Sequence, residues 1–302
     1  MAKNSLDHPL LDLSKMELLR RIHIQPRSLA EGTYAGPHKS NYRGTSVEFS
    51  DYRNYVDGDD IRLLDWKAYA RTDRYYIRLY ESERNLLSYL MIDTSGSMGY
   101  SGTVNQTDSK LKHACRLAAA LGYLTIREGD EAGLTLGGQT VDTHLNPGRS
   151  FTHLAKMLEI MNSAKASGKS DLAKCLDSVY SRIRRRGILM LFSDFLVDLD
   201  KLFATINLFK RSFFEVILFH IVHPEEIDFI PLDSIKCFDP ETDNQGLTVE
   251  PDAVGDLYIR KFQLFLSQIE TLAQGHGCSW YLTRTDKDLY QFLKQSLMEK
   301  SV

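Results

Sequence analysis

Apolar residues in the last two thirds of the chain follow two alternating patterns. Short continuous apolar runs indicate buried strands, and stretches in which apolar residues recur every three or four positions indicate helices. The strand-like runs cover residues 86–92, 131–138, 140–145, 187–194, 214–222 and 278–283. The helical stretches cover roughly 111–121, 151–164, 171–185, 198–211, 254–272 and 287–299. This alternation predicts a doubly wound α/β fold, with a mostly parallel sheet and helices on both faces.

Two pairs of strands depart from that alternation. The runs 131–138 and 140–145 follow each other directly, near Gly137 and Gly138, which predicts a tight connection. The stretch "SIKCFDPETDNQGLTVEP" predicts a β-hairpin with a polar turn at 241–246. We therefore expect a hairpin inserted before the long helix that carries the residues around 254–272.

The first 85 residues have a different character. They are rich in Tyr, Arg, Asp and Gly and show little periodicity before "RYYIRLY" at 74–80. We interpret residues 1–85 as an N-terminal extension packed on an α/β domain that spans residues 86–302.

Composition excludes several broad classes of protein. The 302-residue chain is 43% hydrophobic with a net charge of −3, so no general electrostatic argument favours nucleic acid or an anionic membrane. Its longest apolar runs are far below the roughly 20 residues of a membrane span, and no secretion signal is visible. The four scattered cysteines suggest neither a disulfide framework nor a zinc cluster. We expect a cytoplasmic protein.

Polar residues follow two of the predicted strands directly. The stretch "LLSYLMIDTSGSMGYS" (86–101) ends its apolar run in Asp93, with Ser95 and Ser97 close behind, and Asp194 follows the run 187–194. Ser170 stands just before the helix at 171–185. Ligands of open α/β sheets sit at the carboxyl ends of the strands, so the two carboxylates converge if these strands are neighbours.

Two carboxylates and three hydroxyls are hard oxygen ligands. Such a set suits one Mg²⁺ or Mn²⁺ ion and not Zn²⁺, and an open position on the ion could accept a carboxylate from a partner. Simpler roles are open too, because Ser170 and Asp194 could each cap the helix that follows. Capping and metal binding are compatible, since a hydroxyl oxygen has two lone pairs.

The motif "DTSGSM" resembles the metal-ion-dependent adhesion site of von Willebrand factor A-like domains. That site has the pattern Asp-x-Ser-x-Ser, then a distant Thr and a distant Asp. The resemblance implies that Asp93, Ser95 and Ser97 form the first element and Asp194 the last. Ser170 falls where the family has Thr, a departure that keeps the hydroxyl.

The upstream stretch "RGTSVEFSDYRNYVDGDDIRLLDWKAYARTDRYYIRLYESERN" (43–85) resembles the signature of the domain-of-unknown-function-58 family of bacterial and archaeal proteins. The resemblance extends from about residue 15 to the end of the chain. It implies a von Willebrand A-like fold, no known catalysis and frequent pairing with MoxR-type AAA+ ATPases. We therefore expect a non-enzymatic, metal-dependent protein-interaction module that binds a partner's carboxylate.

The residues of this signature permit two physical interpretations. Asp65, Trp66 and Lys67, with Arg62, suggest a buried aromatic side chain framed by ion pairs, which would tie the extension to the sheet. The alternative is a binding surface formed by Arg53, Arg62 and Arg71.

Three other motifs in the sequence compete with the metal site as interpretations. "DTSGS" also resembles the Asp-x-Asp-x-Thr of haloacid-dehalogenase-like phosphatases, so a Mg²⁺-dependent phosphohydrolase using Asp93 is the alternative function. Ser95 replaces the second aspartate that this chemistry uses as general acid/base. "SAKASGKS" lacks the first glycine of a phosphate-binding loop. His220 and His223 are better explained as a packed histidine and a histidine at the end of a strand than as metal ligands.

Overall fold

The computed structural model describes residues 8–16, 47–56, 64–82, 86–104, 107–228, 235–238, 246–249 and 251–298. The chain divides into two compact units. One unit comprises residues 33–85, and the other comprises residues 1–32 together with 86–302.

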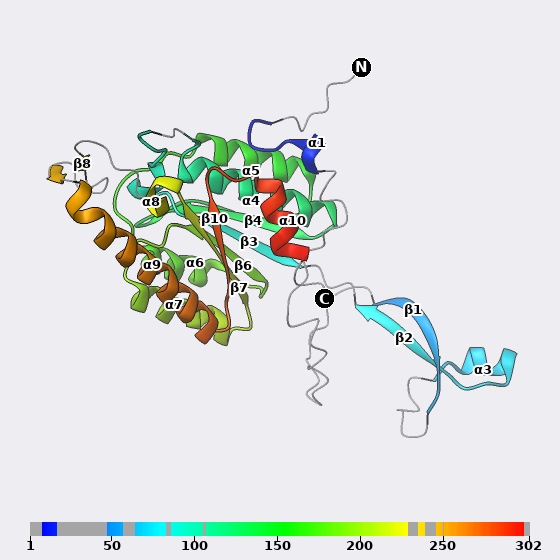
Figure 1. The fold of residues 1–302 in the computed structure, drawn as a ribbon. Coiled ribbons are helices and arrows are strands. Elements are labelled where there is room, and N and C mark those ends of the chain that lie inside the picture. The colour runs from blue at the N-terminus through cyan, green and yellow to red at the C-terminus, as the bar shows by residue number, and fades with distance from the viewer. Residues whose placement is uncertain are drawn as a thin grey trace, which may run out of the picture. The chain divides into compact units, whose positions relative to one another are not determined.

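A six-stranded sheet forms the centre of the larger unit (Figure 1). Its strand order is β10-β7-β6-β3-β4-β5, and the pairs are parallel except at β4 and β5, which run antiparallel. The strands are β3 (Leu87–Ile92), β4 (Glu131–Gly137), β5 (Val141–Gly148), β6 (Ile188–Ser193), β7 (Glu215–Val222) and β10 (Ser279–Arg284). β3 is the first strand of this sheet along the chain and lies inside it, with β4 and β5 added on one side and β6, β7 and β10 on the other. This is the doubly wound arrangement.

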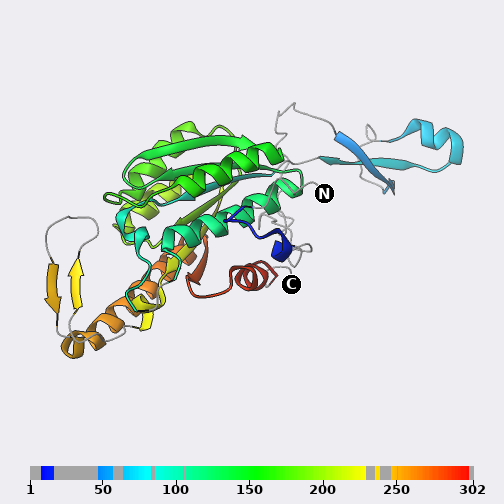
Figure 2. The ribbon, with the colours of Figure 1, turned by 90° about the horizontal axis from the view of Figure 1, so that it is seen from above.

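Helices cover both faces of this sheet (Figures 1 and 2). One hydrophobic cluster joins the sheet to α4 (Lys110–Arg127), α5 (Phe151–Ser163) and α10 (Leu289–Met298). The other joins it to α6 (Leu172–Arg182), α7 (Leu199–Arg211) and α9 (Pro251–Gly275). Among the described helices, none has the length and apolar character that crossing a membrane requires.

Strand β3 shows why the central strands are apolar throughout. All six of its residues are buried. Leu90 and Ile92 belong to the cluster under α4, whereas Leu87, Tyr89 and Met91 belong to the cluster under α6 and α7. Because successive side chains point to opposite faces, a strand covered on both sides needs apolar residues at nearly every position.

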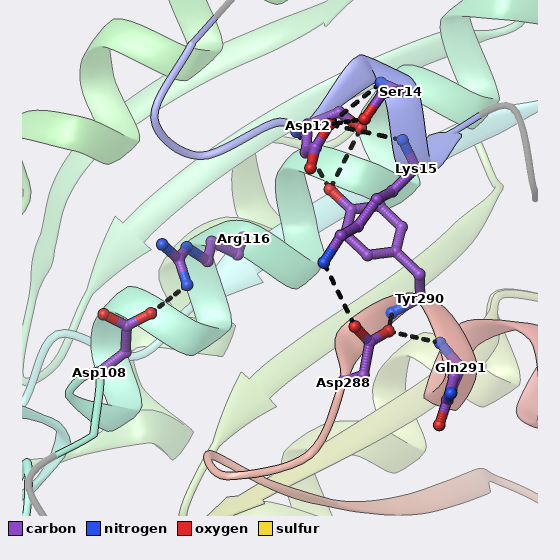
Figure 3. A network of polar contacts seen from close by, with 8 residues as sticks. All are labelled: Asp12, Ser14, Lys15, Asp108, Arg116, Asp288, Tyr290 and Gln291. Atoms are coloured by element: carbon purple, nitrogen blue, oxygen red, sulfur yellow. Dashed lines mark hydrogen bonds and ion pairs between the residues drawn. The ribbon is translucent and has the colours of Figure 1, made fainter.

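The N-terminal segment belongs to the larger unit despite its distance along the chain. Residues 8–16, which include α1 (Leu13–Met16), bury Leu11 in the cluster that contains α10. The backbone N–H of Asp12 donates to the Tyr290 hydroxyl at 3.0 Å, and Lys15 Nζ lies 3.4 Å from Asp288 Oδ2 (Figure 3). Figure 2 shows α1 beside α10.

The predicted elements are largely confirmed. The strands begin and end within one to three residues of the expected positions, and the expected mostly parallel, doubly wound sheet is present. The helix expected at 171–185 ends earlier, at Arg182. The hairpin consists of β8 (Ile235–Phe238) and β9 (Gly246–Val249), which pair antiparallel, and 241–245 of its expected turn lie outside the described residues.

The smaller unit consists of an antiparallel pair, β1 (Val47–Asn54) and β2 (Tyr76–Ser82), with α3 (Trp66–Thr72) between them in the sequence. Asp65 is buried and caps α3 by accepting from the N–H groups of Lys67 and Ala68. The prediction of a buried aromatic side chain is wrong, because Trp66 is 58% exposed. The buried side chain is that of Asp65, whose carboxylate also accepts a hydrogen bond from the Tyr52 hydroxyl at 2.8 Å.

The alternative arginine surface is only partly within the described residues. Arg53 and Arg71 are both exposed, and Arg62 lies outside the described ranges. The proposed arginine surface therefore stays a prediction.

Candidate metal centre

The two aspartates lie at the same edge of the sheet because their strands are neighbours. β3 and β6 pair in parallel, with Ile92 opposite Phe192. Asp93 and Asp194 follow these strands, and the Asp93 N–H donates to the Phe192 carbonyl at 2.9 Å. The two carboxylates therefore converge, as expected for neighbouring strands.

A tight buried turn carries the two serines. The Ser95 N–H donates to Asp93 Oδ1 at 2.9 Å, and the Ser95 and Ser97 hydroxyl oxygens lie 3.2 Å apart. The short 3₁₀ helix η3 (Gly96–Gly99) begins there. Asp93 and Ser95 are fully buried and Ser97 is 7% exposed. The turn thus fixes one carboxylate and two hydroxyls, and the Ser97 hydroxyl also hydrogen-bonds the Asp194 carboxylate.

The loop between α5 and α6 is bound to this turn through its backbone. The Gly96 N–H donates to the Gly168 carbonyl and the Ser167 N–H to the Thr94 carbonyl, both at 2.9 Å. A β-carbon at Gly138 would lie 3.2 Å from the Ser95 nitrogen, so this close approach favours glycine. The loop that carries Ser170 is held in place by these contacts.

Ser170 joins the site but does not cap the helix. Its Oγ lies 3.5 Å from Asp93 Oδ2, and the side chain is half-buried. The N-cap of α6 is Asp171, which accepts from the Lys174 N–H at 3.1 Å. The capping explanation for Ser170 is wrong, because the first helical turn begins one residue later than that explanation requires.

The capping explanation for Asp194 is also wrong. The N-cap of α7 is Asp198, which accepts from the Lys201 N–H at 3.2 Å. Asp194 Oδ1 instead accepts from the Leu196 N–H at 3.2 Å, within the loop between β6 and α7. This loop places the Asp194 side chain at the sheet edge and leaves the capping role to a later aspartate.

Ser193 is a member of the site that the sequence did not reveal. Its hydroxyl donates to Asp93 Oδ2 at 2.7 Å and accepts from the Phe195 N–H at 2.9 Å. Phe195 is buried with a φ of 55°, so the chain turns sharply here. The sequence shows only that Ser193 precedes Asp194 at the end of a strand. This position does not indicate which carboxylate the Ser193 hydroxyl contacts.

Lys110, the first residue of α4, is the largest departure from the expected site. Its side chain is 1% exposed, and Nζ lies 2.7 Å from Asp194 Oδ2 and 2.7 Å from Glu226 Oε1. Glu226 belongs to α8 (Pro224–Asp228), the short helix after β7. The sequence held a faint signal, because Lys110 shares the helical spacing of the buried residues Ala114 and Leu117.

Burial and these charges shift the two site carboxylates in opposite directions. Burial, and next the charge of Asp194, raise the pKa of Asp93 to about 6. Burial alone would raise the pKa of Asp194, but the Lys110 ammonium, with hydrogen bonds from Ser97 and the Leu196 N–H, outweighs burial and holds that pKa below its usual value. Asp194 is therefore the firmly ionised member of the pair.

A second glutamate of α8 holds the loop that follows the motif. Glu225 accepts from the Tyr100 hydroxyl at 2.7 Å and from the N–H groups of Thr103 and Val104, each at 2.9 Å. The Thr103 hydroxyl also donates to it, at 2.8 Å. The loop beside the candidate site is thus anchored to the element that also contacts Lys110.

The donor atoms suit a hard divalent ion in part. Within the described ranges, no three side chains among His, Cys, Asp and Glu form a metal-binding group. An ion at this edge would therefore depend on the hydroxyls of Ser95, Ser97 and Ser170 for most of its ligands. Hydroxyl and carboxylate oxygens are the ligands that Mg²⁺ and Mn²⁺ prefer. Asp194 fits less simply, because one of its oxygens already contacts an ammonium group.

The structure agrees with the rejection of the histidine pair and of the phosphate-binding loop. His220 is fully buried on β7, edge-on to the Phe195 ring, and burial lowers its pKa to about 4. His223 accepts at Nδ1 from the Glu225 N–H at 3.2 Å, at the start of α8. The stretch "SAKASGKS" begins at the end of α5, so no strand leads into it.

Comparison with known proteins gives a family and a set of distant relatives. The family described as "Protein of unknown function DUF58" matches residues 51–260. The uncharacterized protein Rv1480 of Mycobacterium tuberculosis is 25% identical over 292 residues, which cover 95% of this chain and 89% of that protein. The uncharacterized protein Mb1516 of Mycobacterium bovis matches equally well.

Two solved structures resemble this chain at low sequence identity. The conserved hypothetical protein BatB from Bacteroides thetaiotaomicron is 12% identical with a TM-score of 0.46, covering 72% of this chain and 98% of that one. The SpRpn10 VWA domain is 11% identical with a TM-score of 0.41, covering 70% and 95%.

Proposed function

The chain belongs to the DUF58 family and has a von Willebrand A-like fold, and from this premise we propose that it is a metal-dependent protein-interaction module. It binds one Mg²⁺ or Mn²⁺ ion at the edge of its sheet and uses that ion to bind a carboxylate of a partner protein. The observation that carries the proposal is the buried convergence of Asp93, Ser95 and Ser97 with Asp194.

Each of these residues has a part in the proposed binding. The hydroxyls of Ser95, Ser97 and Ser170 and the carboxylate of Asp93 would hold the ion, with Asp194 beside them. A divalent ion there supplies a positive charge with positions left for an outside oxygen. The protein supplies a buried, fixed set of donors, and the loop anchored by Glu225 forms part of the surrounding surface. Because the hydroxyls are neutral, the ion keeps charge for a partner's Asp or Glu.

The partner class comes from the family resemblance and not from a contact in the structure. Proteins that resemble this chain in the signature at 43–85 are frequently paired with MoxR-type AAA+ ATPases. We propose such an ATPase, or another protein that offers an acidic residue, as the partner, with the interaction taking place in the cytoplasm. No catalytic step is proposed, because Ser95 stands where a phosphohydrolase would need a carboxylate.

The metal part of the proposal is tested by calorimetric titration with Mn²⁺. The wild-type chain binds one ion, and Asp93→Ala abolishes this binding while the circular dichroism spectrum stays native. Asp198→Ala is the matched control, because Asp198 is a nearby carboxylate that caps α7 and lies outside the proposed ligand set. Unchanged Mn²⁺ affinity in Asp93→Ala would remove the site.

The partner part is tested by measuring binding to a purified MoxR-type ATPase with and without EDTA. EDTA and Asp93→Ala weaken the complex to the same extent if the ion forms the contact. Equal binding in EDTA would place the interface elsewhere. Hydrolysis of phosphate esters that disappears in Asp93→Asn would favour the phosphohydrolase instead.

A further inference from the structure

Lys110 stands where general physical chemistry disfavours a lysine. Its side chain is almost completely buried, and removing an ammonium group from water is costly. It is also the first residue of α4, after the N-cap Ser109, where the helix dipole is positive and repels a cation. Neither the helix nor the hydrophobic core accounts for a positive charge at this position.

Two carboxylates offset this cost. Burial would lower the pKa of Lys110, but Asp194 and Glu226 outweigh burial and raise it, so the side chain is an ammonium group. Glu226 is itself fixed, because its other oxygen accepts from the His223 N–H at 2.7 Å. Lys110 therefore connects a candidate metal ligand to a carboxylate that α8 holds in place.

The ammonium group cannot itself bind a partner. With 1% of the side chain exposed, no external carboxylate reaches Nζ. The ammonium group instead reduces the negative charge that an incoming ion meets at the site. Of the two site carboxylates, Asp194 is already paired with a cation, and Asp93 hydrogen-bonds only neutral donors among its described contacts.

We propose that Lys110 is a tethered counter-ion, which neutralises Asp194 and so lowers the affinity of the free protein for a divalent ion. The proposal rests on the metal site proposed above. An ion in this site meets one uncompensated carboxylate, Asp93, in place of two. It is held weakly by the protein alone and gains most from a partner's carboxylate, because that group supplies the negative charge that Lys110 cancels.

Mn²⁺ binding to the free protein, followed by the electron paramagnetic resonance signal of unbound Mn²⁺, tests this role. Lys110→Met keeps the length and burial of the side chain but removes the charge. It binds Mn²⁺ about 10-fold more tightly than wild type, because Asp194 then attracts the ion with an uncompensated charge, and tenfold corresponds to about 1.4 kcal/mol. Lys110→Arg keeps the charge and stays near the wild-type affinity.

Lys112→Met is the matched control. Lys112 lies two residues further along α4, its side chain is half exposed, and it pairs with Asp108 at 2.9 Å. This variant removes the same charge from the same helix without touching Asp194, so its Mn²⁺ affinity equals that of wild type. An increase as large as that of Lys110→Met would show a general charge effect and overturn the proposal.

A double variant guards against loss of folding. Lys110→Met leaves two carboxylates facing each other, whereas Lys110→Met with Glu226→Gln removes one charge of each sign. The double variant also binds Mn²⁺ more tightly than wild type, because Asp194 is then free. Glu226→Gln alone, which leaves Lys110 on Asp194, shows no such increase.

The outcomes separate this inference from the function on which it rests. If wild type binds Mn²⁺ and the folded Lys110 variants bind it equally or more weakly, Lys110 has only a structural role and the inference is wrong. If neither the wild type nor the double variant binds Mn²⁺ at millimolar concentration, the metal site itself fails, and the inference fails with it.

Discussion

At the scale of single residues, the neighbours Ser170 and Asp171 have separate roles. Asp171 caps α6, and Ser170 reaches toward Asp93. Ser170→Ala removes a long, weak contact with Asp93 and no cap, so it should lower the free energy of unfolding by about 0.5 kcal/mol. Asp171→Ala should cost about 1 kcal/mol through loss of the cap. Urea denaturation of the two variants measures this difference.

The same pair separates stability from metal binding. If Ser170 is a ligand, Ser170→Ala weakens Mn²⁺ binding in calorimetry, whereas Asp171→Ala leaves it at the wild-type value. Ser170→Thr, which keeps the hydroxyl and has the residue found in the related adhesion sites, should retain binding within a few-fold. Native Mn²⁺ affinity in Ser170→Ala would remove this residue from the ligand set.

At the scale of elements, a buried histidine joins α4 to β10. His113 Nε2 lies 3.0 Å from the Thr283 hydroxyl, and the His113 side chain is buried. The charged groups that face it are Asp108 and Arg116, which pair at the start of α4 (Figure 3), and Asp286 after β10. Burial lowers the pKa of His113 to about 4 in spite of these two carboxylates.

This pKa makes the contact between α4 and β10 sensitive to acid. Between the folded value of about 4 and the unfolded value of 6.5, the unfolded chain binds more protons, so stability falls as the pH falls through this window. The loss attributable to His113 is about 2 kcal/mol between pH 7 and pH 5. His113→Gln should flatten the pH dependence of the unfolding free energy by that amount.

Thr283→Val provides the control for this prediction. It removes the hydroxyl but keeps the titrating ring, so it should lower stability at every pH and leave most of the pH dependence in place. A pH dependence that is identical in wild type and His113→Gln would show that other groups cause it.

At the scale of the whole molecule, the N-terminal segment is part of the α/β unit. Leu11 is 1% exposed and packs in the cluster that contains α10. Leu11→Ala should lower the free energy of unfolding by about 2–5 kcal/mol, the usual cost of truncating a buried leucine. Lys15→Ala removes an exposed ion pair with Asp288 and a cation–π contact with the Tyr290 ring, and it should cost no more than about 1 kcal/mol. Chemical denaturation of both variants measures the contrast, and a negligible effect of Leu11→Ala would contradict the packing.

The sequence by itself determined the fold class and most of the candidate site. The apolar runs fixed the strands, because a strand covered on both faces must be apolar at nearly every position. The position of Asp93 and Asp194 after two such runs was enough to expect a polar edge of the sheet. The family signature and the Asp-x-Ser-x-Ser spacing are local in the chain, so they were visible without a structure.

Only the tertiary structure decided which residues complete the site. Lys110 and Glu226 are 116 positions apart, and Ser193 and Asp93 are 100 apart, so their contacts depend on which strands become neighbours. A lysine at the start of an amphipathic helix ordinarily faces water. Here the crossover from β3 through α4 places Lys110 against two carboxylates. No local sequence pattern predicts this contact.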